Sequence, residues 1–477
     1  MVRMDLVLKI SGEIGVKSAK TRRRFLRALA SNCRAALRRA EVSGTVEPRW
    51  SRLVVRAEDG RALDALSRVC GLHSVSEVEV VGFSSLDDLV ARAADRYRDT
   101  VAGRTFAVRV KRSGDNDFRS RDVAVALGNA LLGVSAGVNL SDPEVVVPVE
   151  ISGDTAYLML DTRPGPGGLP VGVGGRVVSL FSGGFDSPVA TWMAMRRGLS
   201  VDLVVCDLGG CGQVDAALGV ARELASGWAP GIEPRAHVVD LAPVVAALRA
   251  RVASGIRQVV LKRAMYRAGA LLAQRLGAEA LLTGEALGQV STQTLRNLSV
   301  AEEVSDMPVL RPLIGMDKDE IIERARRIGT HDASALVQEH CSISTGRVET
   351  AARLQVVVDA EGRLDESVIL AAVDAAQTID LTTWVPGPPP EHVVDAVPEG
   401  AVVVDVRELD EGPTVGELRL PFSEAATWGP KLDPSKRYLF VCTHGNRSEI
   451  AAHELRGRGL DVSSLAGGLP RLPTRAA

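Results

Sequence analysis

The chain has 477 residues, of which 46% are hydrophobic and 24% charged, and its formal net charge is −2. This length exceeds what one hydrophobic core organises and predicts three or four domains. No apolar run is long enough to span a membrane and no signal peptide precedes the first strand pattern, so we expect a cytoplasmic protein without membrane contact. Six cysteines over this length do not make a disulfide framework.

The first 60 residues are strongly basic, with 14 lysines and arginines against 6 acidic residues. A strand pattern at residues 5–10 is followed by a helical pattern at residues 17–40. Apolar residues recur on one face of this helix, which leaves the basic residues on the other: Lys20, Arg23, Arg24, Arg27, Arg34 and Arg38. A solvated arginine face is common, but so large an excess makes this region the candidate for nucleic-acid contact. Strand and helix patterns then alternate and predict a ferredoxin-like domain, residues 1–84.

Residues 85–170 follow the order helix, strand, helix, strand, strand. The first of these strands runs into Lys111 and Arg112, and Arg119 and Arg121 come soon after. This order resembles the THUMP domain, an RNA-binding module found ahead of several RNA-modifying catalytic domains. A Pro/Gly-rich stretch, residues 162–175, marks the boundary to the next domain.

An apolar run at residues 177–181 predicts a buried strand that stops at SGGFDS, residues 182–187, before a helical pattern begins at Pro188. Adjacent glycines let backbone N–H groups turn inward, and a helix N-terminus attracts anions, so the loop is suited to hold phosphate. A lone Gly-Gly pair would indicate only a strand-to-helix turn. SGGxDS is more specific and resembles the PP-loop of ATP pyrophosphatases, which cleave ATP between the α and β phosphates. The GxxxxGK[ST] pattern is missing, which disfavours γ-phosphate transfer.

Further strands and helices predict a doubly wound α/β domain, residues 171–384, with ligands at the carboxyl ends of its strands. One strand leads into the polar segment TGEALGQVSTQ, residues 283–293. Alone this segment could be a long connection, but together with SGGFDS it predicts the second wall of a nucleotide site. Residues 345–384 are expected to be helical, and VPGPPP, residues 385–390, is a stiff linker.

The last module, residues 391–477, places Cys442 at the end of an apolar strand, before CTHGNRS leads into a helix. Backbone N–H groups, the helix N-terminus and Arg447 should stabilise its thiolate. A lone cysteine at the end of a strand is usually structural. Here CxxGxRS together with Asp405-Val406-Arg407-Glu408 resembles a rhodanese domain, whose loop cysteine carries sulfur as a persulfide.

The other cysteines carry weaker signals. Cys341 follows His340 in a polar stretch without the further cysteines or spaced histidines of a zinc site. Cys206 and Cys211 form an incomplete set for a metal or iron–sulfur site, and Cys206 fits better as the end of a buried strand. We therefore expect no metal held by protein ligands alone. Two cysteines lie on apolar helical faces and are expected in the core: Cys33 and Cys70.

The motifs, taken in chain order, include KSxxTRRRF, SGGFDSP, LKRAMYRAG, TGEALGQVSTQTLRNL, RPLIGMDKDEII, EHCSIS and the rhodanese-like tail. This order is similar, over essentially the whole chain, to the tRNA uracil 4-sulfurtransferases (4-thiouridine synthases) in their longer form with a rhodanese extension. The resemblance implies an α/β multidomain fold, with ferredoxin-like and THUMP α+β modules, a doubly wound PP-loop ATP pyrophosphatase domain and a rhodanese-like α/β domain.

The resemblance also implies roles for individual residues. ATP would be lined by Leu180, Phe181, Ser182, Gly183, Gly184, Asp186, Ser187, Val205, Cys206, Lys262, Gly284 and Gln293. Asp186 would serve catalysis in the loop, Cys442 would carry the persulfide and Cys341 would be its catalytic partner. The implied substrate is the uridine at position 8 of tRNA, with ATP and Mg²⁺ as cofactors, a cysteine desulfurase as sulfur donor and a thiol reductant as partners. The loop residues His444 and Asn446 depart from the rhodanese pattern.

Two other functions fit parts of the sequence. The rhodanese-like module could carry sulfur for thiamine thiazole synthesis without RNA, for which residues 391–477 would suffice. The chain could also be an RNA-binding protein with a vestigial ATP site, against which the intact Asp186, Lys262 and both cysteines, Cys341 and Cys442, argue. The sequence leaves the oligomeric state open, a homodimer included.

Overall fold

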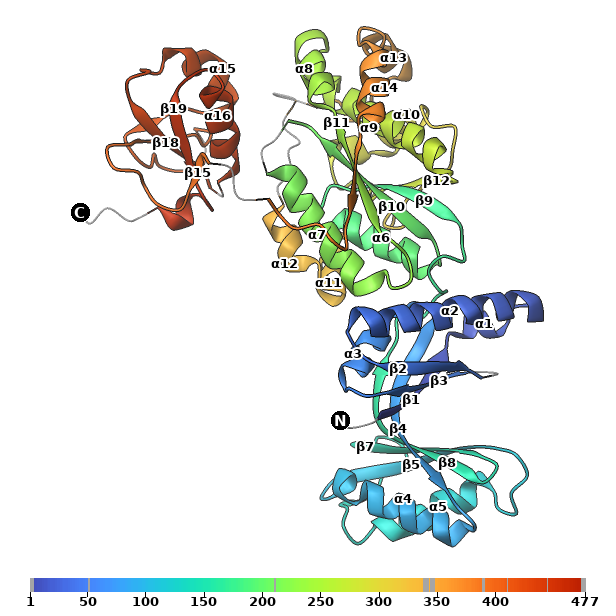
Figure 1. Ribbon diagram of the computed structural model, residues 1–477. Coiled ribbons are helices and arrows are strands. Elements are labelled where there is room, and N and C mark those ends of the chain that lie inside the picture. Colours follow the sequence, from blue (N-terminus) through green and yellow to red (C-terminus); the bar gives the residue numbers. More distant parts are fainter. Residues whose placement is uncertain are drawn as a thin grey trace. The chain divides into compact units, whose positions relative to one another are not determined.

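A computed structural model describes residues 4–49, 52–209, 212–337, 343, 348–387, 391–409, 411–443 and 445–472. For four residues it describes the backbone alone: Ser423, Ala426, Asn446 and Ile450. The chain forms two compact units (Figure 1). The first holds the residues up to Gly174 with two short segments, Met195–Leu199 and Trp228–Ile232, and the second holds the rest.

One eight-stranded sheet organises the first unit, in the order β2-β3-β1-β4-β8-β7-β5-β6. Its strands are β1 (Met4–Ile10), β2 (Gly44–Pro48), β3 (Arg52–Ala57), β4 (Leu72–Gly82), β5 (Thr105–Ser113), β6 (Gly137–Val138), β7 (Val145–Ser152) and β8 (Thr155–Pro164). Its helices are α1 (Gly12–Gly15), α2 (Ala19–Arg39), α3 (Arg61–Ser67), α4 (Leu86–Val101) and α5 (Ser120–Leu131). Because β4 pairs with β8, the ferredoxin-like and THUMP modules share this sheet.

Helix α2 carries the basic surface that the sequence predicts. The Ser18 side chain caps its N-terminus by accepting a hydrogen bond from the N–H of Thr21. Phe25, Leu29 and Cys33 are buried against apolar residues of β1 and β3. The predicted outward residues are exposed: Lys20, Arg23, Arg24, Arg27, Arg34 and Arg38. A second core lies between helices α4 and α5 and strands β5, β7 and β8.

A six-stranded sheet, in the order β13-β12-β9-β10-β11-β14, organises the first part of the second unit. Its strands are β9 (Arg176–Leu180), β10 (Ser200–Asp207), β11 (Arg235–Asp240), β12 (Ala280–Leu282), β13 (Val309–Leu310) and β14 (Gln377–Asp380). The helices along this part of the chain are α6 (Asp186–Arg196), α7 (Gln213–Trp228), α8 (Ala242–Arg251), α9 (Ser254–Leu276), η1 (Ser291–Gln293), α10 (Leu295–Glu302), α11 (Lys318–Ile328), α12 (His331–Leu336), α13 (Leu354–Glu361) and α14 (Glu366–Asp374).

Strand β9 lies where the strand order reverses. It pairs in parallel with β10 on one side and with β12 on the other. The chain proceeds from β9 through β10 to β11 and then returns along α9 to β12 on the opposite side of β9. Doubly wound sheets bind ligands at the carboxyl ends of the strands beside such a reversal. The topology thus confirms the predicted doubly wound domain and indicates where its site lies.

Two predicted details are wrong. Helix α6 begins at Asp186 rather than at Pro188, so the end of SGGFDS already belongs to the helix. Residues 377–380, which we expected to be helical, form β14 and pair antiparallel with β11. Side chains of this edge strand are mostly exposed, and its sequence therefore lacks the apolar alternation that marks a strand.

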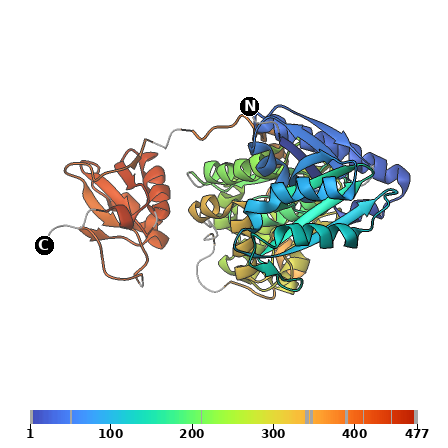
Figure 2. The ribbon, with the colours of Figure 1, turned by 90° about the horizontal axis from the view of Figure 1, so that it is seen from below.

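Residues 391–472 form a five-stranded sheet with its own core (Figure 2). All its strand pairs are parallel, in the order β15-β19-β18-β16-β17. The elements are β15 (Val393–Val394), β16 (Val402–Asp405), β17 (Leu418–Arg419), η2 (Phe422–Glu424), α15 (Ala425–Trp428), η3 (Gly429–Lys431), β18 (Arg437–Val441), α16 (Asn446–Arg456), β19 (Asp461–Leu465) and η4 (Leu469–Arg471). In the part of the chain that the structure describes, no helix is long and apolar enough to cross a membrane.

Candidate active site

The SGGFDS segment forms a tight loop between β9 and α6. The Ser187 hydroxyl accepts hydrogen bonds from the N–H groups of Ser182 and Gly183, at 3.2 and 3.1 Å. Gly183 has a φ of +80°, and a Cβ there would lie 2.7 Å from the Cα of Ala217. At Gly184 such a Cβ would meet the Ser182 hydroxyl oxygen at an ordinary contact distance of 3.7 Å and no backbone atom. The loop N–H groups that Ser187 does not bind, together with the N-terminus of α6, are suited to hold an anion.

The segment after β12 touches the backbone of this loop. A Cβ on Gly284 would lie 2.8 Å from the carbonyl carbon of Asp186 and 2.8 Å from the amide nitrogen of Ser187, so only glycine fits. Gln293 folds the segment back on itself, because its side-chain oxygen accepts a hydrogen bond from the N–H of Ala286 at 3.4 Å. The two predicted walls of the nucleotide site thus meet beside β9, where the strand order reverses.

Lys262 of α9 is paired with a buried carboxylate in the second wall. Its Nζ lies 2.7 Å from Oε1 of Glu285, which is 5% exposed, and donates to the Thr292 hydroxyl at 3.4 Å. The other carboxylate oxygen accepts hydrogen bonds from the Tyr266 hydroxyl at 2.5 Å and from Nε of Arg311 at 2.9 Å. Burial raises the pKa of Glu285, but Lys262, Tyr266 and Arg311 outweigh burial and hold it below its usual value. The positive charge of Lys262 is therefore already compensated.

The carboxylate of Asp186, at the first position of α6, is bound by two side chains. Nζ of Lys318, the first residue of α11, lies 2.8 Å from its Oδ1. Nε2 of Gln289, in the second wall, donates to its Oδ2 at 2.9 Å. Lys318 also lies 5.6 Å from the centre of the Phe185 ring, and the His331 ring lies 5.4 Å from the same centre. These contacts fix the carboxylate at the end of the glycine loop.

The remaining predicted ATP contacts belong to β9, β10 and the start of the loop. Leu180 ends β9, and the next residue, Phe181, is 2% exposed. Val205 and Cys206 near the end of β10 are also buried. Burial raises the pKa of Cys206 to about 12, so its thiol stays protonated near neutral pH. Cys206 is therefore a packing residue, and any nucleotide contact it makes is apolar.

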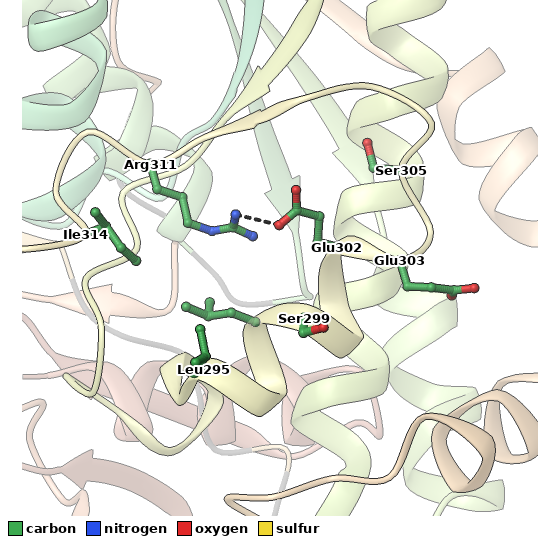
Figure 3. A pocket seen from close by; sticks show the side chains of 8 residues that line it. Leu295, Ser299, Glu302, Glu303, Ser305, Arg311 and Ile314 are labelled. Atoms are coloured by element: carbon green, nitrogen blue, oxygen red, sulfur yellow. Dashed lines mark hydrogen bonds and ion pairs between the residues drawn. The ribbon is translucent and has the colours of Figure 1, made fainter.

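An open depression of about 690 Å³ lies next to the second wall, between α10 and the segment after β13. Its lining mixes apolar and polar side chains: Leu295, Leu298, Ser299, Glu302, Glu303, Ser305, Arg311 and Ile314. Figure 3 shows Arg311 pointing toward Glu302, and their atoms pair at 2.7 Å. Since Arg311 also binds Glu285, its guanidinium joins this depression to the buried carboxylate beside Lys262. Two carboxylates in the lining make it a poor site for phosphate.

Cys442 directly follows β18, as predicted, and is 2% exposed. Its sulfur accepts hydrogen bonds from the N–H of Gly445 at 3.2 Å and from the Ser448 hydroxyl at 3.5 Å. Gly445 has a φ of +102°, which turns the chain into the N-terminus of α16. The Arg447 guanidinium, which the sequence places beside the thiol, binds both carboxylate oxygens of Glu411. The loop supplies the N–H donor that the sequence predicts, while the charge of Arg447 is shared with Glu411.

Four further residues that the sequence analysis named lie outside the described residues: Cys211, His340, Cys341 and His444. Cys33 and Cys70 are buried, and burial raises the pKa of each thiol to about 12, as suits core residues. The predicted helical position of Cys70 is wrong, because α3 ends at Ser67 and Cys70 lies in the turn that follows. Within the described ranges, no three His, Cys, Asp or Glu side chains gather as a metal would require.

Sequence reasoning missed several residues of the site. Glu285 and Gln289 lie inside segment 283–293, but the sequence does not indicate their individual roles. Lys318 and Arg311 lie in RPLIGMDKDEII. The available signal was their position, since Lys318 begins a helix and Arg311 follows a strand. Arg311 is 26 positions from Glu285, and Lys318 is 132 positions from Asp186, so these two ion pairs follow from the fold alone.

The close approach at Gly284 gives a direct test. Gly284→Ala should destabilise the domain by about 1–3 kcal/mol, because the methyl group would meet backbone atoms that cannot rotate away. The loop must shift, so ATP binding measured by titration calorimetry should weaken by at least about tenfold.

Gly219→Ala is the matched control. A Cβ at this position in α7 would meet nothing within 4 Å. This substitution should raise the thermal unfolding midpoint slightly, since alanine is favoured over glycine in a helix by roughly 0.5–1 kcal/mol, and ATP binding should not change. Parent-like ATP binding by Gly284→Ala would mean that the two walls need not touch.

Comparison with protein families divides the chain into three matched regions. Residues 6–76 match the ThiI ferredoxin-like domain, residues 83–161 the THUMP domain, and residues 172–365 the family described as thiamine biosynthesis protein (ThiI).

Relatives match over nearly the full length. A tRNA sulfurtransferase of Pyrobaculum aerophilum is 39% identical over 472 residues, which cover 97% of this chain and 96% of the relative. A tRNA sulfurtransferase of Escherichia coli is 36% identical over 475 residues, covering 96% of this chain and 98% of the relative.

Among solved structures, a 4-thiouridine synthetase in complex with RNA and ATP aligns with a TM-score of 0.69 and 27% identity, covering 79% of this chain and 99% of that chain. PH1313 from Pyrococcus horikoshii shares the fold, with a TM-score of 0.53, 20% identity and coverage of 68% and 99%. Because these relatives are at least 36% identical and match along nearly the whole chain, the chain belongs to the tRNA sulfurtransferase family.

Proposed function

We propose that this protein uses ATP to replace the C4 oxygen of a tRNA uridine with sulfur, giving 4-thiouridine. One observation carries the proposal: loop 182–187 and segment 283–293 meet at the N-terminus of α6, where the strand order reverses. The full-length similarity to tRNA sulfurtransferases and the likeness to a synthetase crystallised with RNA and ATP support it.

The first step makes the uracil oxygen a leaving group. The C4 oxygen attacks the α-phosphorus of ATP, the bond between the α-phosphorus and the bridging oxygen breaks, and pyrophosphate departs with the electron pair. The loop N–H groups that Ser187 does not bind hold the phosphates, and the N-terminus of α6 stabilises the charge that develops on pyrophosphate. The uracil then carries AMP at C4, and AMP leaves far more readily than oxide.

Mg²⁺ suits this site only in company with ATP. Asp186 is the carboxylate that the loop offers, and Mg²⁺ in nucleotide sites takes one or two carboxylates together with phosphate oxygens and water. The ion would supply charge neutralisation at the phosphates.

The sulfur step uses two cysteines. A cysteine desulfurase loads Cys442 with a persulfide, whose inner sulfur is Sγ. Cys341 attacks this inner sulfur, a Cys341–Cys442 disulfide forms, and the outer sulfur attacks C4 as AMP leaves. Two thiols are oxidised as the sulfur is reduced to the sulfide level, so a thiol reductant must reopen the disulfide. Alternatively the outer sulfur attacks C4 first, and Cys341 then resolves the adduct with the same balance.

We assign the steps to parts of the chain. Residues 1–84 and 85–170 bind tRNA, residues 171–384 adenylate the uridine at position 8, and residues 391–477 carry sulfur. A sulfur-carrier role confined to residues 391–477, as thiamine thiazole synthesis would need, is not favoured, because the relatives are similar along the whole chain. The same similarity disfavours a vestigial ATP site.

The adenylation step depends on Asp186. Asp186→Ala should abolish AMP formation in the presence of tRNA and ATP, because the loop loses its carboxylate and Lys318 loses its partner. Persulfide loading of Cys442 should stay at the parent level, since that loop belongs to another sheet. Asp359→Ala, an exposed position on α13, is the control and should keep both activities. Undiminished AMP formation by Asp186→Ala would refute the assignment.

Helix α2 should bind RNA through charge. Replacing Arg23, Arg24 and Arg27 by alanine should weaken tRNA binding and flatten its dependence on salt, each lost phosphate contact lowering the slope of log K against log salt by about 0.7–0.9.

The control for this triple variant removes three arginines of the five-stranded domain instead: Arg437, Arg456 and Arg458. It changes net charge equally and should keep the parent slope. If the α2 variant also keeps that slope, its basic face is only solvated.

The two cysteines should form a redox pair. Cys442→Ser should lose persulfide and product together, whereas Cys341→Ser should load persulfide and fail to turn over. After one turnover without reductant, non-reducing peptide mapping of the parent should reveal a Cys341–Cys442 cross-link. Cys70→Ala, a change in the core, should keep the cross-link. Product formed without any cross-link would mean that sulfur leaves by another route.

A further inference from the structure

Two cross-strand pairs from distant strands of the eight-stranded sheet meet in the first unit. Lys9 of β1 lies directly opposite Arg52 of β3, and Glu150 of β7 lies directly opposite Tyr157 of β8. Nζ of Lys9 is 2.7 Å from one carboxylate oxygen of Glu150, and Nη1 of Arg52 is 2.8 Å from the other. The Arg52 guanidinium also lies 5.5 Å from the centre of the Tyr157 ring. We call these four residues the Glu150 clasp.

These contacts require the sheet to curl over on itself. Strands β4 and β8 separate β1 from β7 in the sheet order, so a flat sheet would hold β1 and β7 about 14 Å apart. The residues next to the clasp in sequence, Leu8, Leu53 and Val149, face the helices in the two main cores. Side chains alternate along a strand, so the clasp points to the opposite face, where the two halves of the sheet meet. A small apolar cluster of that inner face lies on β1, β4 and β8: Val7, Val78 and Met159.

The Glu150 carboxylate is the charge on which this contact depends. Glu150 as a whole residue is 8% exposed, whereas the side chains of Lys9 and Arg52 are 31% and 25% exposed. A buried carboxylate needs its cations, and removing the carboxylate leaves two cations facing each other with no acidic group between them. Loss of Glu150 should therefore open the clasp, while loss of one cation should only weaken it.

We propose that the Glu150 clasp is a positioning device for tRNA, which holds the THUMP half of the sheet at a fixed angle to the half that carries α2. Figure 1 shows α2 on one side of the strands of this unit and α4 and α5 on the other. The inference rests on the proposed function, in which α2 and the THUMP residues Lys111 and Arg119 contact one RNA. Two surfaces held rigidly bind one ligand more tightly than two that move independently, because less freedom is lost on binding.

The test is tRNA binding by the full-length Glu150→Gln variant over a range of salt concentrations. Glutamine keeps the shape and removes the charge. Affinity should fall by about tenfold at every salt concentration while the slope of log K against log salt stays at the parent value, because the phosphate contacts remain and only their pre-organisation is lost. An unchanged slope distinguishes this variant from the α2 variant, for which removal of arginines should flatten the slope. Amide hydrogen exchange should also speed up in β1 and β7.

Glu79→Gln is the matched control, since Glu79 pairs with Arg96 of α4 at 3.0 Å, with both side chains exposed, away from the clasp. It should match the parent in affinity and slope. If Glu150→Gln does not fold, the Lys9→Gln variant is measured instead. Its affinity for tRNA should fall by a smaller factor, again equally at every salt concentration. Unchanged affinity, or a flattened slope, would overturn the clasp. A parent that binds no tRNA would instead overturn the proposed function, and hydrogen exchange would still report whether Glu150 joins the two halves.

Discussion

The close approach of Gly284 to the start of α6 is the constraint on which the catalytic part of the molecule depends. Backbone atoms of Asp186 and Ser187 occupy the space that a side chain at position 284 would need. Two segments about a hundred residues apart can form one site only because a glycine stands at this point. The contact also places Gln289 within reach of Asp186, so the second wall orients the carboxylate of the first.

Charged residues occur in two settings in this molecule, as an exposed basic face and as ion pairs. The basic residues of α2 stay on an exposed face, which suits a partner that brings its own negative charge. Around the nucleotide loop, by contrast, the described cations are matched by carboxylates: Lys262 by Glu285, Arg311 by Glu285 and Glu302, and Lys318 by Asp186. Glu150 of the first unit is also paired, and its ion pairs with Lys9 and Arg52 join β7 to β1 and β3.

Much of this arrangement follows from local sequence patterns. The strand at 177–181, the glycine loop and the amphipathic α2 each carry their own signal, so the fold class and both walls of the site were predictable. Edge strands were not: β2 contains Gly44 and Pro48, and β14 is mostly exposed, so neither shows apolar alternation. The partners of Asp186 and Glu285 were out of reach as well, because they lie on other elements and only the tertiary fold brings them close.

The balanced charges bear on how a polyanion enters the site. ATP brings several negative charges, yet Lys262 and Lys318 each already face a carboxylate, one of them buried. Phosphate binding through either lysine would therefore require an ion pair to open. The loop N–H groups that Ser187 does not bind and those of the first turn of α6 remain, and their fixed dipoles need no counter-charge. A loop of this kind can therefore hold phosphate without the lysine of a GxxxxGK[ST] motif, because backbone dipoles take the place of the ammonium.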